Sequence, residues 1–263
     1  MMNMMKIAVI GVGNLGRVIA NKLAERFDVM AIEKDPDTMR RLENPKIKKS
    51  DKIASAQICD VAIICVKPGD VKTVLTELNP SSSIHIISCA AGTRMGILKG
   101  LGAKRLSRIM PNINIEVDLG LIGYSGEDVT DIFSGFAVCI PLEEDQINLI
   151  TALSASGVAY IWYLTKAFYE YAEQRGIRGE QAKHIVGNLL KGCGEMLLND
   201  GRTIEALIST VATPKGTTAA GLEQLERSGV PNAIKDALKM TEERCRQIEA
   251  SHDVVGNDGR PKS

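Results

Sequence analysis

Short apolar runs alternate with amphipathic segments over the first half of the chain. The predicted strands are residues 7–10, 29–32, 61–66, 84–89 and 137–140. Several of these runs are apolar throughout, which is typical of parallel strands covered on both faces. The predicted helices between them are residues 14–26, 36–42, 71–78 and 93–101. This alternation predicts an α/β fold with a doubly wound parallel sheet.

Helical spacing of apolar residues replaces the strand pattern after Pro141. The predicted helices are residues 143–153, 157–175, 179–199, 202–210, 215–228 and 230–249. Glycine or proline marks the breaks between them. We therefore expect an α/β domain over residues 1–150, an all-helical domain over 151–250 and a disordered tail over 251–263.

Aromatic residues are concentrated in one predicted helix. Six of the ten aromatic residues of the chain fall between Tyr160 and Tyr171. A helix that is apolar nearly all round has to be buried on most sides, and a small helical domain offers little cover. We expect this helix to be buried in a homodimer. The alternative is a central helix within one subunit.

The composition of the chain indicates which binding partners and which cell compartment to expect. The 32 basic residues balance 32 acidic ones, so no net field favours nucleic acid or an anionic membrane. The cysteines are Cys59, Cys65, Cys89, Cys139, Cys193 and Cys245. None forms a C-x-x-C pair, so they predict a reducing compartment without disulfides or a metal site. With no signal-peptide pattern and no apolar run near ~18 residues, we expect a cytoplasmic protein.

A glycine-rich loop follows the first predicted strand and opens the first predicted helix. It consists of Gly11, Val12, Gly13, Asn14, Leu15 and Gly16. In this context the first glycine permits a tight turn, the second admits a pyrophosphate and the third lets helix and strand pack closely. The loop predicts binding of NAD or NADP. A glycine-rich turn without a ligand is the alternative.

The end of the second predicted strand bears on the choice of cofactor. Glu33 lies 22 residues after Gly11, where a carboxylate can accept hydrogen bonds from both ribose hydroxyls of NAD and repels the 2′-phosphate of NADP. The neighbouring Lys34 would instead attract that phosphate. We expect NAD(H) in preference to NADP(H), with two solvated loop charges as the alternative.

Three further strand ends carry residues suited to a ligand, because open α/β sheets bind ligands at their carboxyl edge. Cys65, Val66, Lys67 and Pro68 end one predicted strand. Residues 88–93 end the next, and their small side chains leave room for a flat nicotinamide ring. Residues 108–112 end a third strand.

An anion-binding turn is predicted in the helical half. Pro214 and Gly216 precede an amphipathic run, and Thr213, Thr217 and Thr218 add three hydroxyls. The unpaired N–H groups of a first helical turn bind anions, including carboxylates. An ordinary capped helix is the alternative.

Taken in order along the chain, these segments resemble the pyrroline-5-carboxylate reductase family. The matching segments are GVGNLG (11–16), CVKP (65–68), SCAAGT (88–93), RIMPN (108–112), ALSASGVAY (152–160) and VATPKGTTAAGLEQLE (211–226). The resemblance implies a Rossmann domain, a helical dimerisation domain, assembly as a homodimer or a ring of dimers, and NAD(P)H-dependent reduction of a cyclic imine acid to proline.

The resemblance also assigns roles to individual residues. It implies that Thr218 contacts the ring nitrogen of the substrate and that Thr213, Gly216 and Thr217 hold its carboxylate. It places Asn112 near the nicotinamide and substrate, and residues 65–68 along the cofactor.

The chain departs from the family pattern at five positions: Ile113, Asn114, Val158, Lys166 and Lys215. We expect Lys215 to lie in the first helical turn, where its charge opposes the helix dipole and grips an anionic substrate group; a solvated surface lysine is the alternative. Lys166 is expected to extend along the helix surface or to pair with an acid such as Glu170.

These departures leave a second function open, a reductase of the same build that acts on another imine or carbonyl. The third function left open is that of a non-catalytic NAD-binding regulatory protein. A β-hydroxyacid dehydrogenase is disfavoured, because that family has an asparagine four residues after its lysine and this chain has Glu170 after Lys166.

Overall fold

A computed structural model describes residues 4–253 of the chain. Contacts between residues divide it into two compact units, which differ from the domains expected from the sequence. The first unit comprises residues up to Gly157 together with those from Met240 onward, and the second is Val158–Lys239. The end of the last helix belongs to the first unit because it packs against the sheet: a Cβ on Gly92 would lie 2.5 Å from Cγ2 of Ile248.

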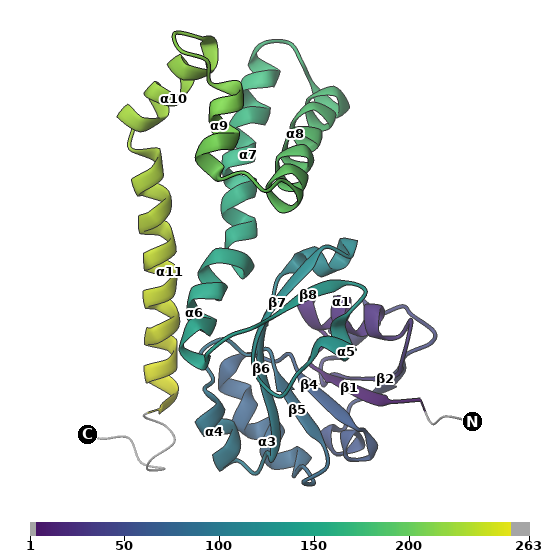
Figure 1. Cartoon of the computed structure of the whole chain (residues 1–263). Coiled ribbons are helices and arrows are strands. Elements are labelled where there is room, and N and C mark those ends of the chain that lie inside the picture. The colour runs from purple at the N-terminus through teal and green to yellow at the C-terminus, as the bar shows by residue number, and fades with distance from the viewer. Residues whose placement is uncertain (1–3, 254–263) are drawn as a thin grey trace. The chain divides into compact units, whose positions relative to one another are not determined.

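The first unit is built on one eight-stranded sheet in the order β3-β2-β1-β4-β5-β6-β7-β8 (Figure 1). The strands are β1 Lys6–Ile10, β2 Asp28–Ile32, β3 Lys48–Ser50, β4 Val61–Ile64, β5 His85–Ser88, β6 Arg105–Pro111, β7 Gly120–Gly126 and β8 Ala137–Pro141. Strands β1 to β6 are parallel, and β7 is antiparallel to β6 and parallel to β8. The predicted Rossmann-type parallel sheet is confirmed, with an added antiparallel edge.

Helices cover both faces of this sheet. They are α1 Asn14–Leu23, α2 Pro36–Arg40, α3 Val71–Leu78, α4 Met95–Gly100, α5 Thr130–Phe133 and α6 Ile147–Ile150. Side chains of β1 alternate between two cores: Ile7 and Val9 belong to the core that contains α1, and Ala8 and Ile10 to the core that contains α3. Strands β1, β2, β4 and β5 contribute side chains to both cores, which explains why their sequences are mostly apolar.

Strands β3 and β7 were not predicted. The sequence of β3 is polar, and β7 contains three glycines, which weaken a strand pattern. The glycines of β7 are required by close packing. A Cβ on Gly120 would lie 2.4 Å from Ile115, and a Cβ on Gly126 would lie 2.3 Å from the carbonyl oxygen of Leu106.

One continuous helix runs from Glu144 to Gln174, so the predicted break at Gly157 is wrong. It contains α6, a π-helical segment at Thr151–Ala155 and α7 Gly157–Gln174. The wider π turn is closed by the N–H of Ser156, which donates to the carbonyl oxygen of Thr151 at 2.8 Å. Within the described residues this is the helix long and apolar enough to cross a membrane by length and composition, although no strictly apolar run is that long. The core helix of a soluble protein passes the same test.

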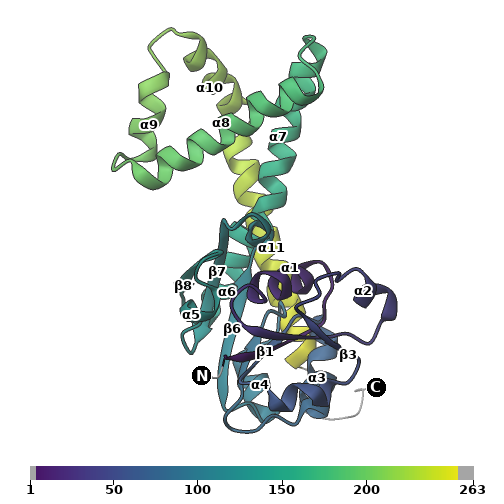
Figure 2. The same ribbon diagram turned by 90° about the vertical axis from the view of Figure 1, so that its right-hand side faces the viewer.

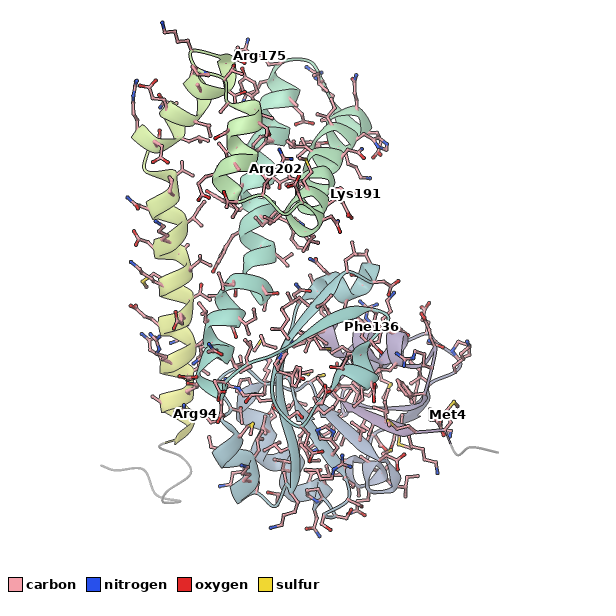
Figure 3. The ribbon with its side chains drawn as sticks, in the orientation of Figure 1. Met4, Arg94, Phe136, Arg175, Lys191 and Arg202 are labelled. Atoms are coloured by element: carbon pink, nitrogen blue, oxygen red, sulfur yellow. The ribbon has the colours of Figure 1, made fainter. Side chains whose placement is uncertain are left out.

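The second unit contains successive helices (Figure 2). They are α7, α8 Gly179–Asn199, α9 Ile204–Val211, α10 Thr217–Arg227 and the start of α11 Val230–Asp253. Large apolar side chains of α7 are exposed in the single chain, among them Trp162 at 60% and Tyr163 at 76%. Arg175, labelled in Figure 3, lies 5.3 Å above the ring centroid of Tyr171.

Helix α11 continues to Asp253, so the first three residues of the predicted disordered tail are helical. The remainder of that predicted tail, residues 254–263, lies outside the described residues.

Candidate functional site

The glycine-rich loop has the geometry that a dinucleotide requires. Gly11 has a φ of 87°, and a Cβ there would lie 2.8 Å from Cγ1 of Val66. A Cβ on Gly16 would lie 2.0 Å from the carbonyl oxygen of Gly11, so helix α1 can approach β1 only with glycine at this position. A Cβ on Gly13 would meet nothing within 4 Å. Gly11 and Gly16 therefore shape the loop, and Gly13 leaves its surface open to a ligand at the start of α1.

Glu33 supports this loop directly. Its carboxylate accepts hydrogen bonds from the N–H of Val12 and the N–H of Asp35, each at 3.1 Å. Lys34 is engaged elsewhere, since its Nζ lies 2.9 Å from Oε1 of Glu77 in a solvent-exposed ion pair. Each carboxylate oxygen of Glu33 retains acceptor capacity for a ribose hydroxyl.

A cavity of about 250 Å³ adjoins Glu33. Its lining includes Gly11, Glu33, Lys34, Val66 and Asp70, and isoleucine, valine and threonine side chains complete the wall. The cavity combines apolar surface with two carboxylates and one ammonium group. These features suit a flat base and a ribose.

The carboxyl edge of the sheet brings three other sequence-predicted segments together. Cys65 follows β4, Cys89 follows β5 and Asn112 follows β6. Lys67 is exposed beyond this edge, and Pro68 opens the short 3-10 turn Pro68–Asp70. The parallel register places these strand ends at the same edge as the glycine-rich loop.

Asn112 has a structural task at this edge. Its Oδ1 accepts from the N–H of Leu121 at 3.2 Å, and its Nδ2 donates to Oγ of Ser154 at 2.9 Å. The side chain is buried and holds the π-helical segment against the sheet. The predicted role near the nicotinamide stays a proposal.

Gly92, in the loop after β5, is required by packing. It has a φ of 71°, and helix α11 packs against it through Ile248. The absence of a side chain at Gly92 makes room for α11, and the space for a nicotinamide ring expected along residues 88–93 stays a prediction. Only Gly adopts this backbone without strain and also tolerates such a close neighbour.

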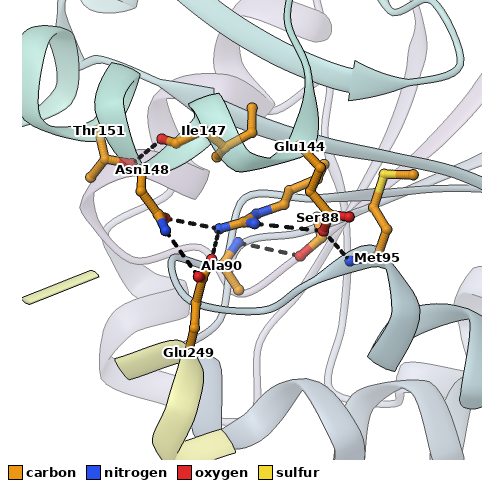
Figure 4. Close-up of polar contacts among 9 residues, drawn as sticks. Ser88, Ala90, Met95, Glu144, Ile147, Asn148, Thr151 and Glu249 are labelled. Atoms are coloured by element: carbon orange, nitrogen blue, oxygen red, sulfur yellow. Dashed lines mark hydrogen bonds and ion pairs between the residues drawn. The ribbon is translucent and has the colours of Figure 1, made fainter. Parts of the chain in front are cut away.

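A buried polar network, which the sequence did not point to, stands behind this loop (Figure 4). Arg108 on β6 is 1% exposed, and its Nη2 donates to Oε1 of Glu249 at 2.8 Å and to Oδ1 of Asn148 at 3.3 Å. Asn148 donates in turn to Oε2 of Glu249 at 2.9 Å. Glu144 lies 3.6 Å from Arg108 and accepts from the N–H of Met95 at 2.6 Å. The signal in the sequence was Arg108 next to the apolar residues Ile109 and Met110 of β6.

The predicted anion-binding turn lies in the second unit, at the start of α10. Gly216 is the N-cap residue, with extended backbone and no side-chain cap, and its N–H donates to the carbonyl oxygen of Thr213 at 2.9 Å. A Cβ on Gly216 would lie 2.5 Å from Oγ1 of Thr213. Thr217 and Thr218 form the first helical positions, so their N–H groups have no acceptor within the helix. The turn is thus free to bind an anion through its backbone.

Lys215 is not in the first helical turn, which corrects the sequence interpretation. It lies two residues before α10 and has a φ of 61°. The left-handed backbone costs a lysine roughly 1–2 kcal/mol. The unfavourable feature of Lys215 is therefore backbone strain at an exposed turn, and not a charge within the first turn of the helix.

The other departures from the family pattern have ordinary environments. Lys166 lies 3.4 Å from Oε1 of Glu170 in an exposed ion pair of the kind expected. Ile113 and Asn114 open the 3-10 turn Ile113–Val117, and Val158 lies in the first turn of α7.

Comparison with known protein families agrees with both units. The model of the pyrroline-5-carboxylate reductase dimerisation domain matches residues 144–248, and that of the coenzyme F420-dependent NADP oxidoreductases matches residues 6–92. Pyrroline-5-carboxylate reductase 3 of Mus musculus is 30% identical over 73% of this chain and 75% of its own length. Pyrroline-5-carboxylate reductase 1 of Bacillus subtilis is 28% identical over 92% of this chain and 89% of its own length.

Solved structures show the same fold. The pyrroline-5-carboxylate reductase of Coxiella burnetii is 26% identical, with a TM-score of 0.80 over 94% of this chain and 99% of that one. A pyrroline carboxylate reductase of Plasmodium falciparum with NADP bound is 23% identical, with a TM-score of 0.85 over 95% of this chain and 99% of that one. With the open glycine loop in one unit and the uncapped threonine-rich turn in the other, these likenesses lead to one conclusion: the chain belongs to the pyrroline-5-carboxylate reductase family.

Proposed function

We propose that this chain reduces 1-pyrroline-5-carboxylate to proline with NAD(P)H. One observation supports the proposal above the others: a single chain holds a dinucleotide loop open at Gly13 and a helix N-terminus at Thr217 that no side chain caps. The first fits the pyrophosphate of a nicotinamide cofactor, and the second fits the carboxylate of an imine acid. Pyrroline-5-carboxylate reductases are the named relatives along nearly the whole chain.

The cofactor, when bound, supplies a hydride to the imine carbon. The chain's own residues bind and orient the reactants. The N–H groups of Thr217 and Thr218 hold the substrate carboxylate, with the hydroxyl of Thr213 beside them. The hydroxyl of Thr218 accepts a hydrogen bond from the protonated ring nitrogen, which keeps the imine in its electrophilic form.

We favour NADH as the reductant. The carboxylate of Glu33 lies at the cavity wall and is fixed by two backbone N–H groups, while Lys34 is paired with Glu77. A fixed carboxylate favours ribose hydroxyls over a 2′-phosphate. Cys65, Val66, Lys67 and Pro68 would continue the cofactor site along the sheet edge.

The assembly we propose is a homodimer formed by the helical unit. The dimerisation-domain model covers this unit, and the exposed aromatic side chains of α7 provide the apolar surface. The proposed assembly extends to a ring of such dimers.

The cell location we propose is the cytoplasm, with no nucleic acid or membrane as partner.

A second candidate is reduction of another imine or carbonyl acid by the same machinery. Lys215 favours it, because the family has glycine at this left-handed position and lysine adds a charge beside the anion turn. A non-catalytic NAD-binding protein is the third possibility.

A panel of cyclic imine acids and related carbonyl acids, each assayed with NADH and NADPH, separates these functions. We expect 1-pyrroline-5-carboxylate to be the best substrate. A higher kcat/KM for another imine acid would identify the second function, and no substrate-dependent oxidation of either cofactor would identify the third.

A further inference from the structure

Two cysteines lie side by side at the carboxyl edge of the sheet. The register pairs Ile64 with Ser88, the last residues of β4 and β5, and Cys65 and Cys89 directly follow them. Their Sγ atoms are 3.5 Å apart. Neighbouring strands are about 4.8 Å apart, within the Cα separations that disulfides bridge, so a bond requires the sulfur atoms to approach by only about 1.5 Å.

The pair packs directly beneath the glycine-rich loop. A Cβ on Gly16 would lie 3.1 Å from Cβ of Cys65, and a Cβ on Gly11 would lie 3.0 Å from the carbonyl carbon of Cys65. The N–H of Cys65 also donates to the carbonyl oxygen of Ile10 at 2.8 Å. Any movement of Cys65 toward β5 therefore withdraws support from the loop.

We propose that Cys65 and Cys89 form a peroxide-sensitive dithiol whose disulfide weakens binding of the nicotinamide cofactor. The effect on cofactor binding rests on the proposed function, since it takes the glycine-rich loop to be the cofactor site. Formation of the disulfide depends on the two thiols and a hydroperoxide, and does not depend on the proposed function.

The two sulfur atoms have different parts in the reaction. Hydrogen bonding to Cys65 and burial raise the pKa of the Cys89 thiol well above its usual value. Cys89 therefore keeps its proton at neutral pH, and Cys65 is the sulfur left to attack.

The reaction proceeds in two steps. The Cys65 thiolate attacks an oxygen of a hydroperoxide, the O–O bond breaks, and an alcohol or water leaves with a proton. Cys89 then loses its proton and attacks the Cys65 sulfenic acid, whose S–O bond breaks to release water. Two thiols are oxidised by two electrons and the peroxide is reduced.

The test uses the full-length reduced protein treated with hydrogen peroxide, followed by N-ethylmaleimide and peptide mass spectrometry. We expect a linked Cys65–Cys89 peptide and at least a tenfold rise in the Kd for NADH, both reversed by dithiothreitol. Burial raises the pKa of Cys139 to about 11, so this thiol should stay unoxidised and serve as the internal reference.

Two variants separate this reaction from general oxidation. Cys193→Ser removes an exposed thiol on α8 and should behave as the wild type does. Cys89→Ser should give no linked peptide and leave a sulfenic acid on Cys65 that dimedone labels. Maleimide labelling of both cysteines after peroxide treatment, or a linked peptide with an unchanged Kd for NADH, would overturn the proposal. Assay of the reduced, untreated protein with 1-pyrroline-5-carboxylate tests the proposed function separately.

Discussion

Oε1 of Glu249 lies 2.8 Å from Nη2 of Arg108, although 141 positions separate the two residues in the chain. The Arg108 side chain is 1% exposed and that of Glu249 is 10% exposed. This ion pair joins the end of α11 to strand β6 of the sheet. It therefore explains why residues from Met240 onward belong to the first unit.

Removing the carboxylate of this pair should destabilise the protein strongly. Glu249→Ala leaves the buried guanidinium of Arg108 with only the longer ion pair to Glu144. Breaking a buried pair by removing one partner costs about 3–5 kcal/mol. Asp236→Asn is the control on the same helix: it removes an exposed pair with Lys239 and should cost less than about 1 kcal/mol. Urea unfolding at one protein concentration measures both. Equal losses in the two variants would show that the buried pair adds nothing.

His85 should make the stability of the protein depend on pH. Its Nε2 lies 2.8 Å from Oγ of Ser107, whose hydroxyl donates to the carbonyl oxygen of Glu127 at 2.6 Å. Burial lowers the pKa of His85 below its usual value of about 6.5. The unfolded chain thus binds more protons, and the free energy of unfolding should fall as the pH drops below about 6.5.

The variant His85→Gln should lose that part of the pH dependence. Urea unfolding of both proteins between about pH 5 and pH 8 provides the measurement. If the wild type and the variant lose stability in parallel as the pH falls, His85 does not titrate in the way its burial requires.

Lys215 should affect substrate binding through its charge and stability through its backbone. Lys215→Gly removes both the ammonium group and the left-handed strain, and Lys215→Gln removes only the charge. Both variants should raise KM for the preferred substrate, with a smaller effect at high salt. In Lys215→Gly, relief of the backbone strain offsets the larger conformational entropy that glycine loses on folding. This variant should therefore change the free energy of unfolding by less than about 1 kcal/mol. Unchanged KM values in both variants would make Lys215 a surface residue.

Glu33 should determine the choice of cofactor. Glu33→Asn removes the negative charge and should raise the use of NADPH relative to NADH, whereas Lys34→Gln should leave that ratio nearly unchanged. The ratio of kcat/KM values for the two cofactors is the measurement. A wild-type enzyme that already prefers NADPH tenfold would assign control of the site to Lys34.

The parts of the fold that could be predicted were those in which local sequence and burial agree. Strands β1, β2, β4 and β5 are apolar because both faces are covered, and the Gly11–Gly16 loop follows β1 in the required order. Strand β7 could not be predicted, because its glycines are dictated by Ile115 and Leu106, which the local pattern does not show. Helix α11 likewise gives no local sign that its end returns to the sheet.

The residues of the candidate site that could be predicted are likewise those that a local sequence pattern marks. Glu33 and the start of α10 were recognised because each lies at a defined place in a strand–loop or loop–helix pattern. The pairing of Cys65 with Cys89 depends on strand order, and the pairing of Arg108 with Glu249 depends on tertiary packing. The sequence placed Lys215 within the helix because the helix was expected to begin at residue 215, just after Pro214. It begins two residues later, at Thr217.

The most direct measurement is the initial rate of NADH and NADPH oxidation with 1-pyrroline-5-carboxylate, for the wild type, Thr218→Ala and Thr218→Ser. Loss of one hydrogen bond in a desolvated site should lower kcat/KM by about 1–3 kcal/mol in Thr218→Ala, and Thr218→Ser should recover most of that loss. We predict substrate-dependent oxidation by the wild type with this order of variants. A wild-type protein that oxidises neither cofactor in the presence of this imine would contradict the proposed reaction. A Thr218→Ala variant with unchanged kcat/KM would contradict the role of Thr218.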